Sequence, residues 1–309
     1  MKTTEQSAPS SFASPLPDWG LIHATGADAR DFLHGQLTND LLHLGPDSAQ
    51  WSAYCSAKGR MYAGFLVWRD GADGFFLACD KALIPALVKR LRMFVLRAKA
   101  VIEDASAAWD VHGIAVPAAP PVVGMSEPMQ LQRGSATLVG LPPVDGMQRS
   151  LAIVPAGQVH ASGLALGSAT DWQRLMIHAG EAWITPATVE QFIPQMVNFD
   201  AIGGINFKKG CYPGQEVVAR AHYRGAVKRR TYLAHVEGEA KAGDPLFASD
   251  LNGQESGLVA NAAPAVGGGS DVLAVIQIQS HANAEVRLGS PEGPKLNFAD
   301  LPYPLPAAA

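Results

Sequence analysis

The apolar residues of this chain recur at helical spacing in some stretches and at alternate positions in others. Residues 24–40, 81–99 and 171–180 repeat apolar side chains every three or four positions and therefore predict short helices. The apolar stripe of the first stretch consists of Ala29, Phe32, Leu33 and Leu37, and that of the second of Leu83, Leu87, Leu91 and Phe94. In the third stretch, Asp171 is placed to cap the helix and Gly180 to end it.

Residues 48–80 alternate instead between the two faces of a strand. Breaks at Lys58-Gly59 and Asp70-Gly71 predict a meander of strands with two turns, and residues 100–117 predict further strands. Residues 228–309 consist of short β-rich runs separated by Gly-rich breaks, a pattern typical of a small antiparallel barrel or sandwich. Because the helices are isolated among strands rather than arranged in regular βαβ units, we expect the α+β class.

The changes in composition along the chain predict a division into domains. Residues 1–17 are polar and rich in Ser and Pro, which indicates a mobile tail, with order beginning near Trp19. A body of two subdomains is expected over residues 18–226, with its junction near 117–145. That junction is rich in Pro and Gly and predicts a loop-rich connection with one short hairpin. Residues 227–309 are expected to form the carboxy-terminal β-barrel.

Composition and charge exclude several classes of protein. Of the 309 residues, 48% are hydrophobic and 17% charged, which allows a sizeable core and excludes disorder for most of the chain. The net charge of −4 excludes a globally basic coat, so direct nucleic-acid binding is disfavoured except through a local patch.

The cysteine content and hydropathy predict the cellular setting. Three cysteines without a CxxC pair argue against a disulfide framework and against a self-contained zinc or iron–sulfur site. No apolar run reaches membrane-spanning length, and the amino-terminal stretch lacks the apolar core of a secretory signal. We therefore expect a cytoplasmic protein without a membrane partner.

The stretch NFKKGCYPGQEVVARAHYRG, residues 206–225, holds Cys211 beside Lys208 and Lys209. Pro213 suits the first position of a following helix, because its missing N–H is not needed there. A helix N-terminus and two lysines would favour the thiolate of Cys211, which predicts a reactive cysteine. The spacing alone is equally compatible with a buried structural cysteine.

The charged residues of the same stretch also allow two interpretations. Glu216 and Arg220 stand four apart and can form a surface ion pair on a helix rather than a site. The basic residues Arg220, Arg224, Lys228, Arg229 and Arg230 can bind phosphate or can belong to a solvated strand end. The sequence shows no aromatic residues interleaved with them in a recognisable motif, which makes direct nucleic-acid binding the weakest of the functions considered.

Several short motifs together resemble the YgfZ family, the folate-binding relatives of the glycine-cleavage aminomethyltransferase, or T-protein. The densest match is Lys209-Gly210-Cys211-Tyr212, Gly214-Gln215-Glu216, Arg220, Tyr223-Arg224-Gly225 and Arg229. Further matches are Phe32–Thr38, Cys55–Arg60, Gln191–Asn198, Gly203–Lys208 and Leu301–Tyr303. The resemblance covers nearly the whole chain from Trp19 and is weakest over residues 117–167.

The resemblance implies an aminomethyltransferase-like folate-binding body followed by a β-barrel. It also implies a central site for tetrahydrofolate or a one-carbon derivative, at which Trp19 and Trp172 bind the cofactor. An indole offers a flat apolar face to a pterin or aminobenzoyl ring, although each tryptophan could equally fill a core. The two remaining cysteines, Cys55 and Cys79, are interpreted as structural.

The resemblance further implies that Cys211 is the functional thiol, supported by Lys209, Gln215, Glu216 and Arg220. The family supports the assembly or repair of iron–sulfur client enzymes and is linked to a radical enzyme that modifies tRNA. A thiolate of this kind could accept oxidised sulfur, attack a one-carbon unit or help a cluster in transit. The sequence does not choose among these roles.

One departure from the family pattern lies in IHAGEAWI, where His178 and Ala182 stand at positions of a Glu-Ala-Gly motif. A glutamate of this region contacts the pterin in the transferase relatives, and a histidine cannot make the same paired contact. The alternative function is a tetrahydrofolate-dependent aminomethyl or methyl transferase, which needs a carboxylate near the folate nitrogen. Asp40 and Asp200 are the carboxylates nearest to recognisable motifs, so catalytic turnover remains open at this point.

Overall fold

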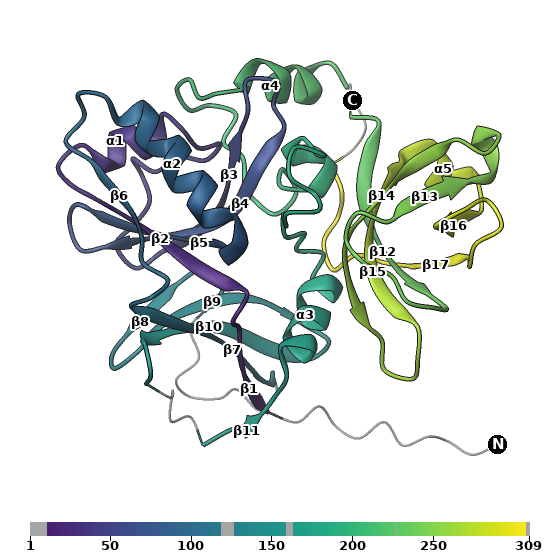
Figure 1. Ribbon diagram of the computed structural model, residues 1–309, viewed down its shortest axis with the longest axis horizontal. Helices are drawn as coiled ribbons and strands as arrows, with labels where there is room; N and C mark the ends of the chain where they lie inside the picture. Colours follow the sequence, from purple (N-terminus) through teal and green to yellow (C-terminus); the bar gives the residue numbers. More distant parts are fainter. Residues whose placement is uncertain (1–10, 119–126, 159–162, 226, 307–309) are drawn as a thin grey trace.

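The computed structural model describes residues 11–118, 127–158, 163–225 and 227–306. Within them the chain forms three β-sheets flanked by short helices (Figure 1). Among the described residues, the strand pairs of these sheets are antiparallel, except for the parallel pair of β1 with β11. This sheet-rich mixture of strands and isolated helices agrees with the predicted α+β class.

One sheet contains the predicted meander and has the order β3-β4-β5-β2-β6. Its strands are β2 Trp19–Thr25, β3 Ala49–Cys55, β4 Met61–Asp70, β5 Gly74–Asp80 and β6 Val101–Asp104. The turns fall where the sequence placed them, since Gly59 and Gly71 adopt φ of 70° and 65°, which favours glycine. Strands β3, β4 and β5 are largely buried on both faces, which explains their continuous apolar runs.

A second sheet has the order β11-β1-β7-β10-β9-β8. Its strands are β1 Phe12–Pro15, β7 Trp109–Pro117, β8 Leu131–Arg133, β9 Thr137–Val144, β10 Met147–Pro155 and β11 Ala165–Leu166. Strand β1 pairs with β7 upstream of Trp19, so ordered structure begins before the position expected from sequence. The hairpin of β8 and β9 lies in the Pro- and Gly-rich junction, as predicted. Residues 1–10 of the expected tail lie outside the described residues.

The carboxy-terminal sheet is antiparallel, but it is a half-barrel rather than the closed barrel expected from sequence. Its order is β16-β13-β14-β15-β12-β17, and its edge strands meet only through one isolated bridge, Arg287 with Lys295. The strands are β12 Arg229–Val236, β13 Pro245–Ala248, β14 Glu255–Pro264, β15 Ser270–Gln277, β16 Val286–Leu288 and β17 Leu296–Ala299. The edge strands are only three and four residues long, which is too short for a closing ladder.

The helices agree with the apolar spacing, with two differences. They are α1 Ala29–His34, α2 Ile84–Val95, α3 Ala169–His178, α4 Gln215–Tyr223 and α5 Ile278–Asn283, with single 3₁₀ turns at Lys81–Leu83, Pro194–Val197 and Ser249–Leu251. Ser168, not Asp171, caps α3, and Asp171 completes a capping box from the third helical position. Of the predicted stripe, Leu83, Leu87 and Leu91 are buried in the core, whereas Phe94, in the last turn of α2, is 44% exposed.

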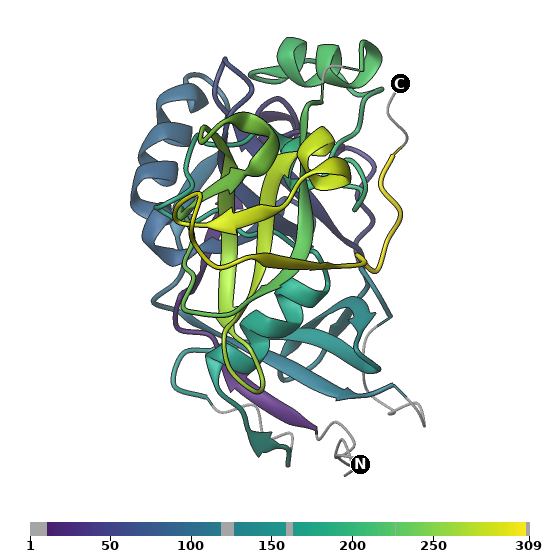
Figure 2. The same ribbon diagram turned by 90° about the vertical axis from the view of Figure 1, so that its right-hand side faces the viewer.

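Helix α3 lies between the second sheet and the half-barrel, and α4 lies on the top of the molecule in Figure 1. In the view turned by 90°, the half-barrel lies in front of the first sheet, and strands of the second sheet extend below it (Figure 2). It has an apolar core of its own, while Ala260, Ala263, Leu273 and Val275 join the larger core of the other sheets. No helix of the described residues is long and apolar enough to cross a membrane.

Candidate functional site

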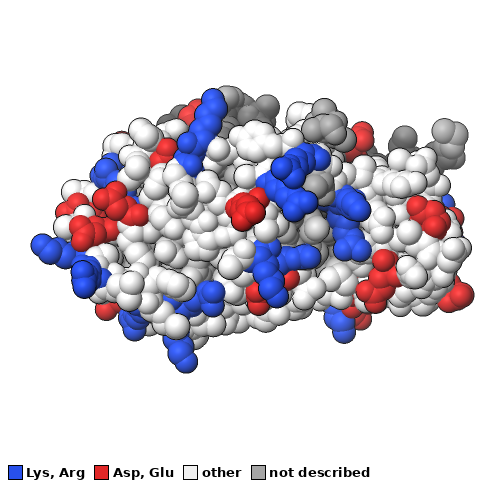
Figure 3. All heavy atoms as spheres, turned by 90° about the horizontal axis from the view of Figure 1, so that it is seen from above, with Lys and Arg blue, Asp and Glu red and all other residues white. Residues whose placement is uncertain are grey.

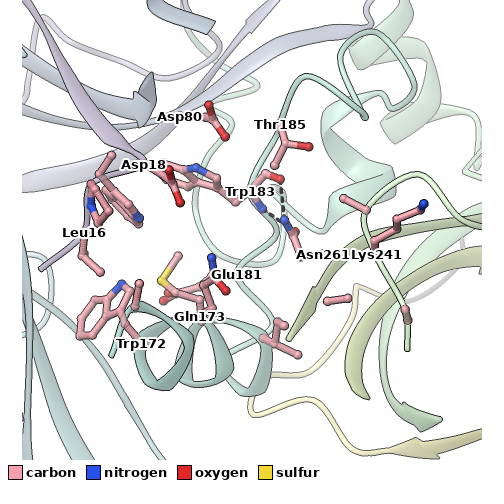
Figure 4. Close-up of a pocket in the computed structure, with 18 residues that line it drawn as sticks. Leu16, Asp18, Asp80, Trp172, Gln173, Glu181, Trp183, Thr185, Lys241 and Asn261 are labelled. Atoms are coloured by element: carbon pink, nitrogen blue, oxygen red, sulfur yellow. Dashed lines mark hydrogen bonds between the residues drawn. The ribbon is translucent and has the colours of Figure 1, made fainter. Parts of the chain in front are cut away.

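A cavity of about 310 Å³ lies between the start of β2, α3 and the half-barrel (Figure 4). Its walls come from parts of the chain that are distant in sequence: residues 16–19, Asp80, residues between 169 and 185, and residues 240–242 and 261–262. This volume lies at the lower end of the range usual for small-molecule sites. We call it the tryptophan cavity, because Trp19, Trp172 and Trp183 line it.

Two of these tryptophans stack on each other. The ring centroids of Trp19 and Trp183 are 3.9 Å apart with an interplanar angle of 26°, and Trp51 meets Trp183 edge-on at 6.4 Å. The structure thus brings both predicted cofactor residues, Trp19 and Trp172, to one cavity. It adds Trp183, which the sequence did not single out.

Trp172 is buried at the back of the tryptophan cavity. Its side chain is 0% exposed, and the ring lies so close to β7 that a Cβ on Gly113 would be 2.3 Å from it. Glycine is therefore required at position 113 for the indole to fit. Among the described residues, the Trp172 indole nitrogen has no hydrogen-bond partner. A buried N–H without a partner is costly, so this donor is available to a ligand in the cavity.

Glu181 supplies a carboxylate to the same cavity, and Arg149 holds it in place. Arg149 Nη1 and Nη2 donate to Glu181 Oε2 and Oε1 at 3.0 and 2.9 Å, and the Arg149 side chain is fully buried. Nε and Nη2 of the same arginine also donate to the Pro142 carbonyl at 2.9 and 2.7 Å. Both partners are therefore oriented, and each carboxylate oxygen keeps a lone pair for a further donor.

Asn261 on β14 fixes the backbone of Trp183 from the other side. Its side chain accepts from the Trp183 N–H and donates to the Trp183 carbonyl, both at 2.8 Å, as the dashed lines in Figure 4 show. Asp18, Asp80 and Lys241 supply further charge to the lining. Burial raises the pKa of the Asp80 carboxyl above its usual value, although the Ala82 N–H opposes the shift.

His178, where the sequence departs from the family, does not line the tryptophan cavity. Its Nδ1 contacts Asp145 and its Nε2 contacts Asp271 at 2.9 Å, and His235 Nδ1 contacts Asp271 at 3.0 Å. The hydrogen bond with Asp145 raises the pKa of His178, with Asp271 acting in the same direction. The carboxylate that this stretch contributes to the cavity is therefore Glu181, three residues further on, and His178 instead links α3 to the half-barrel.

Cys211 is exposed and carries a free thiol. Helix α4 begins at Gln215, with Gly214 as its N-cap at φ of 81°. The expectation that Pro213 occupies the first helical position is therefore wrong. The left-handed conformation of Gly214 places the helix start at Gln215, two residues after Pro213, so Cys211 does not sit directly at the helix end.

Two motifs distant in sequence meet at Gly59 and Gly214. A Cβ on Gly214 would lie 2.4 Å from the Ser56 carbonyl oxygen and 2.7 Å from the Gly59 Cα. The turn after Cys55 thus packs against the start of α4. Gln215 Nε2 donates to the Lys209 and Gly210 carbonyls at 3.4 Å each, and so holds the backbone that precedes Cys211.

Lys209 is anchored beneath the cysteine. Its ammonium group donates to the carbonyls of His34 and Leu37, the latter at 2.6 Å. Burial lowers the pKa of Lys209 to about 8, while Asp40 and Cys211 oppose the shift. Lys209 is therefore a half-buried cation next to the exposed thiol.

The remaining signature residues lie on the exposed face of α4. Glu216 and Arg220 are both exposed, and no ion pair joins them. Cys55 and Cys79 are buried, and burial raises the pKa of both thiols, in line with structural roles. Cys211 is not among the residues that line the tryptophan cavity. In the part of the chain that the structure describes, no group of three His, Cys, Asp or Glu residues is placed to hold a metal ion.

The two carboxylates considered for a transferase have other partners. The Asp200 side chain is 5% exposed and forms a bidentate pair with Arg230, at 2.6 and 2.8 Å. This pair links β12 of the half-barrel to the segment after the 3₁₀ turn Pro194–Val197. Asp40 accepts from the Leu42 N–H at 2.9 Å and contacts His43 Nδ1 at 2.8 Å. Neither lines the tryptophan cavity, whereas Asp18 and Asp80 do.

Sequence reasoning missed Arg149, Glu181, Trp183 and Asn261. Glu181 and Trp183 lie in GEAW, within the stretch in which His178 and Ala182 depart from the family pattern. An acid directly after a helix-ending glycine and between apolar neighbours was the available signal for Glu181. Arg149 and Asn261 gave no local signal, because their partners are 32 and 78 residues away.

The chain has an aminomethyltransferase-like fold. The glycine cleavage system aminomethyltransferase T from Bartonella henselae matches 96% of this chain and 87% of its own, with a TM-score of 0.72. At 14% sequence identity this likeness concerns the fold alone. No protein-family model matches the chain.

Comparison of sequences identifies the family of the chain. The tRNA-modifying protein YgfZ of Escherichia coli O157:H7 (strain EC4115 / EHEC) is 34% identical over 230 residues, covering 71% of this chain and 70% of the relative. The protein of the same name from Escherichia coli (strain K12 / DH10B) is 33% identical over the same shares. The chain belongs to the YgfZ family.

Proposed function

We propose that this protein binds a tetrahydrofolate in the tryptophan cavity and thereby supports tRNA modification. The role in tRNA modification is supported by the relatives in Escherichia coli, which are named tRNA-modifying proteins. The folate ligand is supported by the aminomethyltransferase-like fold. In the proposal, the folate-bound protein maintains iron–sulfur client enzymes, including a radical enzyme that modifies tRNA, and Cys211 is the thiol that acts on them.

The observation that carries the folate proposal is the Arg149–Glu181 pair facing the three tryptophans. A pterin presents neighbouring N–H donors along one edge of a flat ring system, and the faces of that ring are free to contact aromatic side chains. Glu181 would accept from that edge, while Trp19 and Trp183 would contact the ring. Trp172 would contribute its unpartnered N–H, which can donate to a ring nitrogen or carbonyl. Lys241 would favour an anionic tail at the cavity wall.

The test is an anaerobic calorimetric titration of the purified full chain with tetrahydrofolate. Saturable one-to-one binding is the expected result. Trp172→Phe keeps an aromatic ring but removes the indole N–H together with the fused five-membered ring, so it should weaken binding by roughly tenfold or more, of which a buried hydrogen bond accounts for about 1.4 kcal/mol. Trp109→Phe is the matched control, because Trp109 does not line the cavity.

Equal affinity of Trp172→Phe and wild type would argue against this orientation of the ligand. Absence of binding at millimolar tetrahydrofolate, in protein shown to be folded, would rule out the folate function altogether. Cys211 is tested separately, by complementation of a strain that lacks the chromosomal copy. Full activity of Cys211→Ala in that strain would exclude the thiol from the function.

A transferase is the second candidate, and Asp80 is the observation in its favour. Asp80 lines the tryptophan cavity, and burial raises the pKa of its carboxyl, which suits a group that takes a proton from a folate nitrogen. Sustained ammonia release from an aminomethylated lipoyl carrier in the presence of tetrahydrofolate, abolished in Asp80→Asn, would establish turnover. If the protein binds folate but shows no turnover, the transferase is excluded and the proposed support of iron–sulfur client enzymes stands.

A further inference from the structure

The exposed face of α4 carries aromatic and cationic side chains next to each other. Arg220 and Arg224 are exposed one turn apart, and Tyr223 is 66% exposed. Among the described residues, neither arginine has a carboxylate within ion-pair distance. Their charges therefore remain available to an anionic partner.

Tyr223 belongs to a cluster of three rings that only the tertiary structure assembles. Phe207 stacks on His222 with centroids 3.8 Å apart and an interplanar angle of 13°. Tyr223 meets His222 edge-on at 4.8 Å and Phe207 at 6.3 Å. The neighbours hold the Tyr223 ring in one orientation while most of it faces solvent.

The positive surface continues beyond α4. A Cβ on Gly59 would lie 2.9 Å from Val217 Cβ, so the turn that carries Lys58 and Arg60 lies directly against the helix. Lys58, Arg60 and Arg229 in turn line a cavity of about 470 Å³. Figure 3 looks onto the face that carries α4 and shows several lysines and arginines gathered there, with few acidic side chains among them.

Not every charge in this region is positive or free. Glu216 lies on α4, and Glu190 and Glu255 line the cavity with the three cations. Arg230, considered from the sequence as part of a basic patch, is excluded because it is buried against Asp200. We define the α4 surface as Lys58, Arg60, Arg220, Tyr223, Arg224, Lys228 and Arg229. Its cations outnumber the three carboxylates, although the whole chain carries a net charge of −4.

We propose that the α4 surface binds single-stranded nucleic acid, with its lysines and arginines on the phosphates and Tyr223 stacked on an unpaired base. Cations along a backbone path and an oriented, exposed aromatic ring are the two elements that such binding requires. A duplex would satisfy the cations but offers no base face to the tyrosine. This inference goes beyond the proposed function, which requires no contact between this chain and nucleic acid.

The test measures fluorescence anisotropy of labelled oligonucleotides with the full chain over a series of salt concentrations. The probes are oligouridine and oligodeoxythymidine of about 12 nucleotides, within the usual site sizes. Comparing them distinguishes RNA from DNA as the source of the same phosphate and base chemistry. Arg220→Gln and Arg224→Gln should each reduce the slope of log affinity against log salt by about 0.7.

Tyr223→Ala should weaken binding roughly tenfold without changing that slope, since it removes stacking and no charge. Tyr223→Phe should bind as wild type does, because the ring is retained. Arg97→Gln is the matched control, an exposed arginine just after α2 and outside the α4 surface. These substitutions are all at exposed positions, so they should leave the fold intact.

The inference would be overturned by unchanged binding in Arg220→Gln, Arg224→Gln and Tyr223→Ala, by an equal loss in Arg97→Gln, or by equal affinity for a fully paired duplex. Displacement of the oligonucleotide by polyglutamate at equal charge concentration would also overturn it and would identify an acidic polypeptide as the partner. Oligonucleotide binding in a protein that fails to bind tetrahydrofolate would leave this inference standing and remove the proposed function instead.

Discussion

Arg149 and Glu181 form a fully buried bidentate ion pair at the tryptophan cavity, linking β10 to the segment that follows α3. The guanidinium is held in turn by the Pro142 carbonyl. The carboxylate is thus oriented before any ligand arrives, which reduces the ordering cost of binding. The same pair makes a stability prediction that needs no ligand.

Removing one member of this pair should destabilise the protein strongly. Arg149→Met leaves the Glu181 carboxylate buried without its partner, and such a loss costs about 3–5 kcal/mol. Urea unfolding monitored by tryptophan fluorescence measures the change in unfolding free energy. The double variant Arg149→Met with Glu181→Leu should recover much of it, because no buried charge remains. A single variant within about 0.5 kcal/mol of wild type would show that the pair is not buried in solution.

The contact between Gly59 and Gly214 predicts a difference between two glycine substitutions. Gly214 and Gly146 both have positive φ, 81° and 71°, but only Gly214 has backbone atoms where a Cβ would stand. Gly146→Ala should cost about 1–2 kcal/mol for the left-handed conformation. Gly214→Ala should cost clearly more, since α4 must also move away from Ser56. Thermal unfolding of the two variants provides the comparison, and equal losses would contradict the close approach.

The three thiols should differ sharply in reactivity. Cys211 is exposed, whereas Cys55 and Cys79 are buried and burial raises the pKa of each. A thiol reagent should therefore modify one cysteine in the native protein and three after denaturation. Cys211→Ser should abolish the native reaction, and Cys55→Ser should not change it. Rapid native labelling of Cys211→Ser would place a second thiol at the surface.

The contact between His178 and its two carboxylates should make stability depend on pH. Asp145 and Asp271 raise the folded-state pKa of His178 above 6.5, and His235 and Glu237 are the other titratable groups around Asp271. A raised pKa stabilises the fold below the unfolded-state value and loses this effect as pH rises through the folded-state value. His178→Gln should therefore cost more at about pH 5.5 than at about pH 8.5. Urea unfolding of both proteins at each pH is the measurement, and a larger cost at high pH would contradict the sign.

Much of the fold was predictable because it depends on local spacing. The meander of β3, β4 and β5 alternates over residues 48–80, and its turns occur at glycines that adopt positive φ. The sequence did not predict that the carboxy-terminal sheet remains an open half-barrel instead of closing into a barrel. Closure depends on the length and pairing of β16 and β17, which short Gly-rich segments do not specify.

The sequence by itself determined the family, the signature motif around Cys211 and two of the three cavity tryptophans. These features are carried by residues that are adjacent in the chain or match a short motif. Only the tertiary structure decided that Glu181, rather than His178, faces the cavity, since both lie within one turn of the end of α3. The tertiary structure also decided which arginines are free to bind a partner. Arg220 and Arg230 look alike in sequence, but Arg230 forms an ion pair with the distant Asp200, whereas Arg220 forms none among the described residues. Such pairings join residues across sheets, and no spacing along the chain records them.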